Sequence, residues 1–133
     1  MASILREIAL NQSVDRVWDA LRDFHAVDRR VAPGFITRSE PDGTARIITF
    51  ANGSTAKEEL VDCDDTARRL VYAISNERLK HYNAAVQVFA DGAVHCRLVW
   101  TVDVLPNDLA AYVGQQMDAA VKVMKPTLER TSP

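Results

Sequence analysis

The sequence predicts an α+β protein in which seven antiparallel strands form one curved sheet around a long C-terminal helix. Two short helices are expected between the first and second strands. Three observations predict this class. Hydrophobic and polar residues alternate over most of residues 35–104, short turn signals divide this stretch, and the last part of the chain carries an apolar stripe at helical spacing. A strongly twisted sheet of this size curls around the element that is long enough to cover it.

The chain begins with a strand that is followed by two helices. Residues Ser3 to Leu10 alternate with period 2, except that Arg6 interrupts the apolar side. Ser13 is a favourable N-cap, and apolar residues follow it at helical spacing: Val14, Val17, Trp18, Leu21 and Phe24. A second short helix is expected from His25 to about Arg30, ended by Pro33-Gly34.

Six further strands are expected between residues 35 and 104. Turn signals separate them at Pro41-Asp42-Gly43, Asn52-Gly53, Asp64-Asp65, Asn76-Glu77 and Asp91-Gly92. Strands joined by such short turns must be antiparallel neighbours, so the segments form a meander. The predicted strands are Phe35–Glu40, Thr44–Ala51, Thr55–Cys63, Arg69–Ser75, Tyr82–Ala90 and Ala93–Val104.

A long helix is expected after Pro106-Asn107, which ends the last strand. One stripe of this helix is apolar and consists of Leu109, Val113, Met117, Ala120 and Met124. Pro126 is expected to bend or end the helix, because proline lacks an N–H and crowds the preceding turn. Residues 131–133 are expected to form a tail. With no repeat or linker in the sequence, we expect a single domain over residues 1–133.

The composition argues against several classes of function. The chain is 47% hydrophobic and 26% charged, and its 16 basic and 18 acidic residues give a net charge of −2. Such a balance does not supply the concentrated positive field that nucleic acid or an anionic membrane requires. The three histidines show no metal-ligand spacing, and there is no GxSxG motif or glycine-rich phosphate loop. We therefore expect no metal, no cofactor and no nucleic-acid partner.

The N-terminal residues do not resemble a signal peptide. Arg6 and Glu7 fall inside the apolar stretch there, whereas a signal peptide needs an uninterrupted apolar region. No apolar run approaches the roughly 18 residues of a membrane span. A cytoplasmic location without membrane insertion is the resulting expectation. Cys63 and Cys96 are expected to be free thiols, and the oligomeric state is left open between monomer and homodimer.

Several short motifs in this order resemble the polyketide cyclase/dehydrase and lipid-transport family of the START-like (SRPBCC, birch-pollen-allergen-like) superfamily. The motifs are Val17-Trp18, Gly43-Thr-Ala-Arg46, Lys57-Glu-Glu-Leu60, Arg69-Leu-Val-Tyr72 and Leu98-Val-Trp100, followed by the closing helix. The resemblance runs from Ile4 to about Leu128. It implies a helix-grip fold, with a deep apolar cavity between the sheet and the C-terminal helix. The cone-shaped barrel of the ketosteroid isomerase type is an alternative, but that fold begins with long helices.

Two loops resemble those of the plant abscisic-acid receptors in the same superfamily. The segment Asn76-Glu-Arg-Leu-Lys-His-Tyr82 is similar to their latch loop, and Ala51-Asn-Gly-Ser-Thr55 stands where their gate loop would be, without its proline. The resemblance implies a pair of loops beside a cavity mouth. It does not imply hormone or phosphatase binding.

Strand parity selects the candidate ligand-binding residues. The last strand places Val94, Leu98 and Trp100 on one face, and the strand before it turns Tyr82 inward. Thr55–Cys63 is ambiguous by periodicity, because either Ala56, Glu58 and Leu60 or Lys57, Glu59, Val61 and Cys63 could face the core. The family resemblance favours Glu58, since the family often places a carboxylate of this strand in the cavity. The candidate set is Arg46, Ile48, Phe50, Glu58, Leu60, Tyr72, Tyr82, Leu98, Trp100, Val113 and Met117.

The roles of the polar candidates stay open at this point. Glu58 is either a buried carboxylate or an exposed strand residue, and Arg46 is either its partner or a residue at the solvent-exposed rim. The aromatic residues are either cavity walls or core. We expect the protein to bind a small hydrophobic molecule such as a lipid, a polyketide or an aromatic metabolite. The alternative is a cofactor-independent cyclase/dehydrase in which Glu58 and a tyrosine, tentatively Tyr82, act as acid and base. A third possibility is a partner-binding or chaperone-like domain with a filled cavity.

Overall fold

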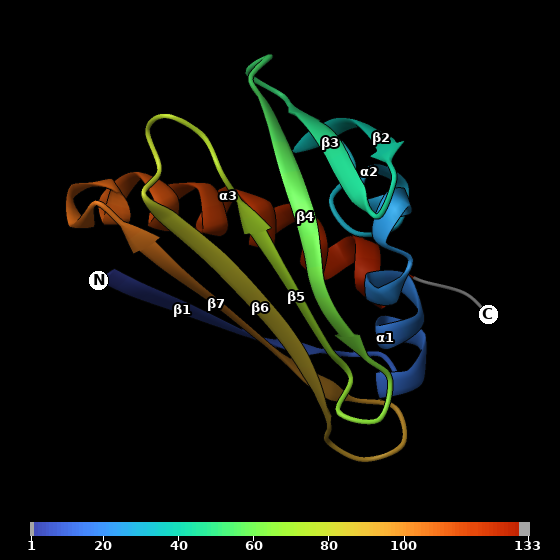
Figure 1. The fold of residues 1–133 in the computed structure, drawn as a ribbon. Helices are drawn as coiled ribbons and strands as arrows, with labels where there is room; N and C mark the ends of the chain where they lie inside the picture. The colour runs from blue at the N-terminus through green and yellow to red at the C-terminus, as the bar shows by residue number, and fades with distance from the viewer. Residues whose placement is uncertain (1, 131–133) are drawn as a thin grey trace.

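A computed structural model describes residues 2–130 of the chain, and its architecture is a seven-stranded antiparallel sheet wrapped around a long helix (Figure 1). The spatial order of the strands is β1-β7-β6-β5-β4-β3-β2. The chain therefore runs through a meander from β2 to β7, and β1 closes the far side by pairing with β7 from Ala2↔Val104 to Leu10↔Cys96. The strands are β1 (Ala2–Leu10), β2 (Ile36–Asp42), β3 (Ala45–Phe50), β4 (Thr55–Asp64), β5 (Arg69–Ile74), β6 (His81–Ala90) and β7 (Cys96–Leu105).

The helices lie at two places. Between β1 and β2 the chain forms α1 (Val14–Arg22), the 3-10 helix η1 (Phe24–Ala26) and α2 (Val27–Arg30). After β7 it forms the 3-10 helix η2 (Asn107–Leu109) and α3 (Ala110–Glu129). Ser13 is the N-cap of α1 as predicted, because its side chain accepts a hydrogen bond from the Arg16 amide. No helix among residues 2–130 is both long enough and apolar enough to span a membrane.

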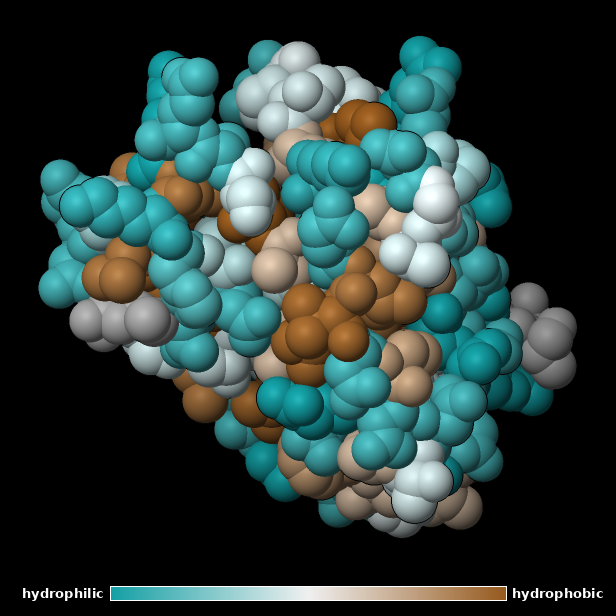
Figure 2. Space-filling model, viewed as in Figure 1, coloured by the Kyte–Doolittle hydropathy of each residue, from teal (hydrophilic) through white to brown (hydrophobic). Residues whose placement is uncertain are grey.

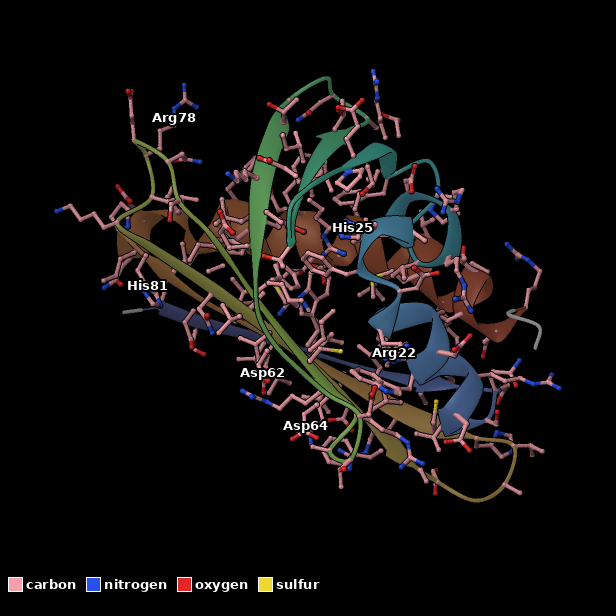
Figure 3. The ribbon with its side chains drawn as sticks, turned by 45° about the vertical axis from the view of Figure 1, so that its right-hand side comes forward. Arg22, His25, Asp62, Asp64, Arg78 and His81 are labelled. Atoms are coloured by element: carbon pink, nitrogen blue, oxygen red, sulfur yellow. The ribbon has the colours of Figure 1, made fainter. Side chains whose placement is uncertain are left out.

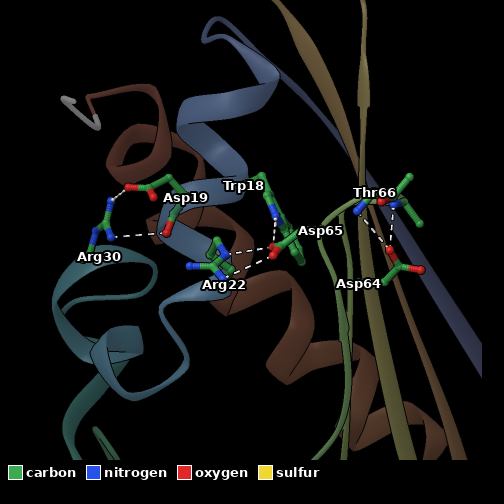
Figure 4. A network of polar contacts seen from close by, with 8 residues as sticks. Trp18, Asp19, Arg22, Arg30, Asp64, Asp65 and Thr66 are labelled. Carbon is green, nitrogen blue, oxygen red and sulfur yellow. Dashed lines mark hydrogen bonds and ion pairs between the residues drawn. The ribbon is translucent and has the colours of Figure 1, made fainter.

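The second half of α1 and the turn between β4 and β5 are joined by polar contacts (Figure 4). The Trp18 indole N–H donates to Asp65 Oδ1 at 2.9 Å, and Arg22 Nε donates to the same oxygen at 2.8 Å. These two bonds hold the pKa of Asp65 below its usual value. Arg30 of α2 in turn pairs with Asp19 of α1 at 2.8 Å. The short helices are thereby held against the sheet, with α1 in contact with β6 and α2 in contact with β2.

The predicted inner face is confirmed for most strands and wrong at two places, and one strand end also differs from the prediction. Ala93–His95 precede β7 instead of belonging to it, so Val94 is 63% exposed and does not face inward. Pro41 and Asp42 belong to β2, and the turn follows them at Gly43-Thr44. A register shift in β4 between Leu60 and Asp62 reverses the parity of the strand end, so Cys63 packs against the core.

The long helix also differs from the expectation at its end. It neither ends nor breaks at Pro126 but continues to Glu129. Proline removes one N–H from the helix, while the neighbouring Thr127 hydroxyl donates to the Val123 carbonyl at 2.8 Å. Leu128, two residues after the proline, is fully buried, and this burial favours the helical path beyond the proline. Residues 131–133, the expected tail, lie outside the described residues.

The outer face of the sheet is mainly hydrophilic, with a small apolar area in the middle of the face shown in Figure 2. Val61 of β4, the residue inside the register shift, is 57% exposed on that strand. The large buried side chains lie on the opposite face, between the sheet and the helices. The core and any interior site therefore share the concave side of the sheet.

Candidate ligand cavity

A cavity of about 610 Å³ lies between the concave face of the sheet, the short helix α2 and the long helix α3. Its walls combine apolar side chains with a few polar ones. The sheet contributes the predicted residues Arg46, Ile48, Phe50, Glu58, Tyr72, Tyr82 and Trp100, and α3 contributes Val113 and Met117. The volume falls in the range of about 300–1,000 Å³ that is usual for small-molecule sites.

Two predicted site residues lie elsewhere. Leu60 and Leu98 are not among the residues that line the cavity. Leu98 has 0% exposure and packs inside the core, and Leu60 is partly buried beside it. Parity places both on the concave face, but that face extends well beyond the cavity. The sequence analysis also missed lining residues from α2 and the loop after it, including Val27, Val31 and Phe35. A four-residue helix carries no periodic signal, so only the fold brings it over the sheet.

Arg46 and Glu58 form an ion pair in the wall of the cavity. They stand directly opposite each other on β3 and β4, and each residue is only 4% exposed. Arg46 Nε donates to Glu58 Oε1 at 2.7 Å, and Nη2 lies 2.7 Å from the same oxygen. Arg46 Nη1 donates to the Phe24 carbonyl at 2.8 Å. Burial raises the pKa of Glu58 above its ordinary value, while the charge and hydrogen bond of Arg46 act in the opposite direction.

Aromatic rings complete the surroundings of this ion pair. The Arg46 guanidinium carbon lies 3.9 Å from the centroid of the Phe24 ring and 5.0 Å from that of Tyr72. Such stacking favours a buried guanidinium, because the ring faces carry partial negative charge. Tyr82 and Trp100 line the same cavity on the neighbouring strands. The site thus combines apolar walls with one neutralised ion pair and two phenol hydroxyls.

Burial raises the pKa of both Tyr72 and Tyr82, and the nearby carboxylate of Glu58 adds to the effect. Both groups therefore stay protonated at neutral pH. The folded-state pKa lies above the unfolded value of about 10, so the stability that each contributes is present below that pH and is lost as the pH rises above it.

A prediction about alkaline titration follows from these shifts. We expect Tyr72→Phe and Tyr82→Phe to leave the tyrosinate absorbance of the folded protein unchanged, because neither phenol ionises before the fold opens. The measurement is ultraviolet absorbance at rising pH, with circular dichroism reporting the fold. The wild-type protein, titrated in parallel, is the reference. A lower amplitude for either buried variant in the folded range would contradict the assigned burial.

The mouth of the cavity lies between two loops and the start of α3. The exposed lining residues are Ser54 in the turn after β3, Thr55 at the start of β4, Asn76 and Arg78 in the loop between β5 and β6, and Tyr112 of α3. In Figure 3 the Arg78 side chain projects from the tip of the β5–β6 loop, away from the body of the protein. These are the two loops that the sequence resemblance placed beside a cavity mouth.

A curved antiparallel sheet that grips a C-terminal helix, with an apolar cavity between them, defines the helix-grip class of START-like proteins. Within that class the chain belongs to the polyketide cyclase / dehydrase and lipid transport family, whose family model matches residues 1–131. No curated protein matches the chain in sequence.

Solved structures with this fold come from bacteria and plants. An uncharacterised protein from Bacillus thuringiensis superposes with a TM-score of 0.84 at 18% identity, over 96% of this chain and 98% of that chain. A START superfamily protein from Mycobacterium smegmatis gives a TM-score of 0.74 at 11% identity, over 96% and 94% of the two chains. Norcoclaurine synthase from Thalictrum flavum, in complex with dopamine and hydroxybenzaldehyde, gives 0.73 at 18% identity, over 99% and 89%. At these identities the likeness concerns the fold alone.

Proposed function

We propose that this protein binds a small, mostly apolar molecule in the cavity between the sheet and α3. The observation that carries the proposal is the cavity of about 610 Å³, whose walls are largely apolar and which reaches the surface at the two loops. Apolar walls supply affinity by removing apolar surface from water, and a few polar groups orient the ligand. The family description, which includes lipid transport, supports this class of function, and so does the shared fold of norcoclaurine synthase, which was solved in complex with dopamine and hydroxybenzaldehyde.

The same cavity supports catalysis as a second candidate. Glu58, Tyr72 and Tyr82 line one space, and a carboxylate with a phenol is a usable acid–base pair. The ion pair favours binding instead, because Arg46 already holds Glu58 Oε1 and thereby lowers its ability to take up a proton. One measurement separates the two candidates. Native mass spectrometry of the protein from its own cells identifies a bound molecule, which incubation with the protein then leaves unchanged or converts.

Filling the cavity is expected to abolish binding without unfolding the protein. Val113 of α3 lines the cavity, so Val113→Trp places an indole where the ligand would lie. We expect the affinity for the neutral fluorescent probe N-phenyl-1-naphthylamine to fall by at least about tenfold, the equivalent of about 1.4 kcal/mol. Ala119→Trp is the matched control, since Ala119 is exposed on the same helix. Probe binding that is equal in both variants, or absent from the wild-type protein, would count against the proposal.

The cytoplasmic location, the single-domain organisation over residues 1–133, the independence from a cofactor and the choice between monomer and homodimer stay predictions. None of them enters the argument for the cavity.

A further inference from the structure

Two arginines line the cavity: Arg78 lies at the mouth and projects away from the body of the protein (Figure 3), whereas Arg46 lies in the buried wall, where its charge is already paired within the protein. Every nitrogen of the Arg46 guanidinium has a protein oxygen within 2.8 Å: Nε and Nη2 face Glu58 Oε1, and Nη1 faces the Phe24 carbonyl. The rings of Phe24 and Tyr72 lie over the guanidinium. A ligand carboxylate would therefore have to displace a buried ion pair to reach this cation. That exchange is unfavourable, because a buried charge that loses its partner is strongly destabilised.

Glu58, the negative partner of this ion pair, in contrast has a second carboxylate oxygen that is open to a hydrogen-bond donor. Both contacts from Arg46 go to Oε1 of Glu58, and Oε2 accepts no hydrogen bond from the residues that the structure describes. Among residues 2–130, the fully buried side-chain atoms without a hydrogen-bond partner belong to three other residues, and Oε2 is not one of them. Because Glu58 lines the cavity, Oε2 is the atom of the ion pair that a ligand hydroxyl there can use as an acceptor. The open position of the ion pair is thus an acceptor, not a donor.

We infer that the ligand is an uncharged molecule whose polar group, a hydroxyl or phenol, donates a hydrogen bond to Glu58 Oε2. This inference rests on the proposed function and specifies its ligand class. A neutral donor satisfies the oxygen without adding a second buried charge, whereas an ether leaves it unpaired and a carboxylate repels it. The hydroxyls of Tyr72 and Tyr82, which line the same cavity, add groups that can accept or donate toward the same ligand hydroxyl.

Three probes with the same apolar body test the inference on the wild-type protein. They are 2-naphthol, which donates, 2-methoxynaphthalene, which only accepts, and 2-naphthoate, which is an anion. Calorimetric titration at neutral pH should rank 2-naphthol first, with each of the others at least about tenfold weaker, as expected when a hydrogen-bond partner of a charged group is left unpaired. Equal binding of the methoxy compound, or tighter binding of the naphthoate, overturns the inference while leaving the cavity function in place.

Variants locate the preference at Glu58. In Glu58→Gln the side-chain amide weakens the acceptor, so the advantage of 2-naphthol over 2-methoxynaphthalene should shrink several-fold. Glu59→Gln is the matched control, because Glu59 is the next residue and points to solvent, and it should keep the full advantage. If Glu58→Gln does not fold, the double variant Arg46→Met/Glu58→Leu removes both charges together and should abolish the advantage. An advantage that persists in the double variant overturns the inference.

Failure of the inference and failure of the proposed function give different results. If N-phenyl-1-naphthylamine binds and Val113→Trp removes it, but none of the three naphthalene probes binds, the donor preference is overturned and the cavity function stands. If neither that probe nor the naphthalenes bind, both proposals are overturned.

Discussion

Replacing Glu58 with leucine is expected to lower the free energy of unfolding by about 3–5 kcal/mol. The residue is 4% exposed and its partner Arg46 is equally buried, so the substitution leaves a guanidinium without a counter-charge inside the protein. Arginine cannot escape this cost by losing its proton, because a guanidinium stays protonated in proteins. The loss is expected at neutral pH. Urea denaturation followed by tryptophan fluorescence measures it.

The reciprocal variant, Arg46→Met, is expected to behave differently with pH. It leaves a buried carboxyl group, whose pKa burial already raises and whose lowering by Arg46 is now gone. The folded-state pKa then lies above the unfolded value of about 4.3, so protonation stabilises the folded state at low pH, and this contribution is lost as the pH rises through the folded-state pKa. The destabilisation by Arg46→Met should thus be largest at neutral pH and shrink as the pH falls.

Removing both charges together tests whether the ion pair itself stabilises the fold. Arg46→Met/Glu58→Leu should regain most of the loss and could exceed the wild type by about 1–4 kcal/mol, since a well-packed apolar pair avoids the desolvation of two charges. The neighbouring exposed pair of Lys57 and Glu59, 3.5 Å apart, is the control. Its removal should change stability by less than about 1 kcal/mol. Equal effects of the two pairs would show that the Arg46–Glu58 pair is hydrated.

Truncating Leu98 to alanine is expected to lower the free energy of unfolding by about 2–5 kcal/mol, through the lost burial and the cavity left behind. Leu98 has 0% exposure and lies on β7 between Ile8 of β1 and Val88 of β6. Its neighbours belong to the paired core of the sheet and cannot close around an empty space without moving both strands. Chemical denaturation measures the loss. Leu5→Ala is the control, since Leu5 is 54% exposed and its truncation should change stability by about 0.5 kcal/mol or less.

The Leu98→Ala variant also tests whether a core residue outside the cavity affects ligand binding. Because Leu98 does not line the cavity, the folded Leu98→Ala protein should bind N-phenyl-1-naphthylamine as the wild type does. Trp100→Leu, two residues along the same strand and face, removes a cavity wall and should change the affinity. A folded Leu98→Ala protein with strongly reduced probe binding would mean that the leucine side chain contributes to the ligand site after all.

Much of the candidate site could be predicted because a strand has a period of two. Parity identified Tyr82 of β6 and Trp100 of β7 as inward-facing, and the structure has both on the concave side. The rule fails where the register shifts. One extra residue near Val61 turns Cys63 inward, and nothing in the alternation of β4 marks that position.

The sequence could not predict which charged side chains pair with each other or how far the ligand cavity extends. Arg46 and Glu58 are twelve residues apart, and only the register of β3 against β4 places them opposite each other. Likewise, Arg6 interrupts an apolar pattern in β1, and only the packing of α3 explains it: its guanidinium pairs with Asp118 and lies 3.1 Å from where a side chain on Gly114 would begin.

The sequence by itself determined the meander from β2 to β7, the closing helix and the family, because local periodicity, turn residues and short motifs carry that information along the chain. For β6 and β7 it also indicated which side chains face the concave side of the sheet. Only the tertiary structure decided which of them meet a ligand-sized space. Leu98 and Trp100 share one strand and one parity, yet the first is sealed in the core and the second lines the cavity. The physical reason is that the cavity is the space that the helices and the sheet leave unfilled. Its position and size depend on how these separate elements pack together, and no single element determines them.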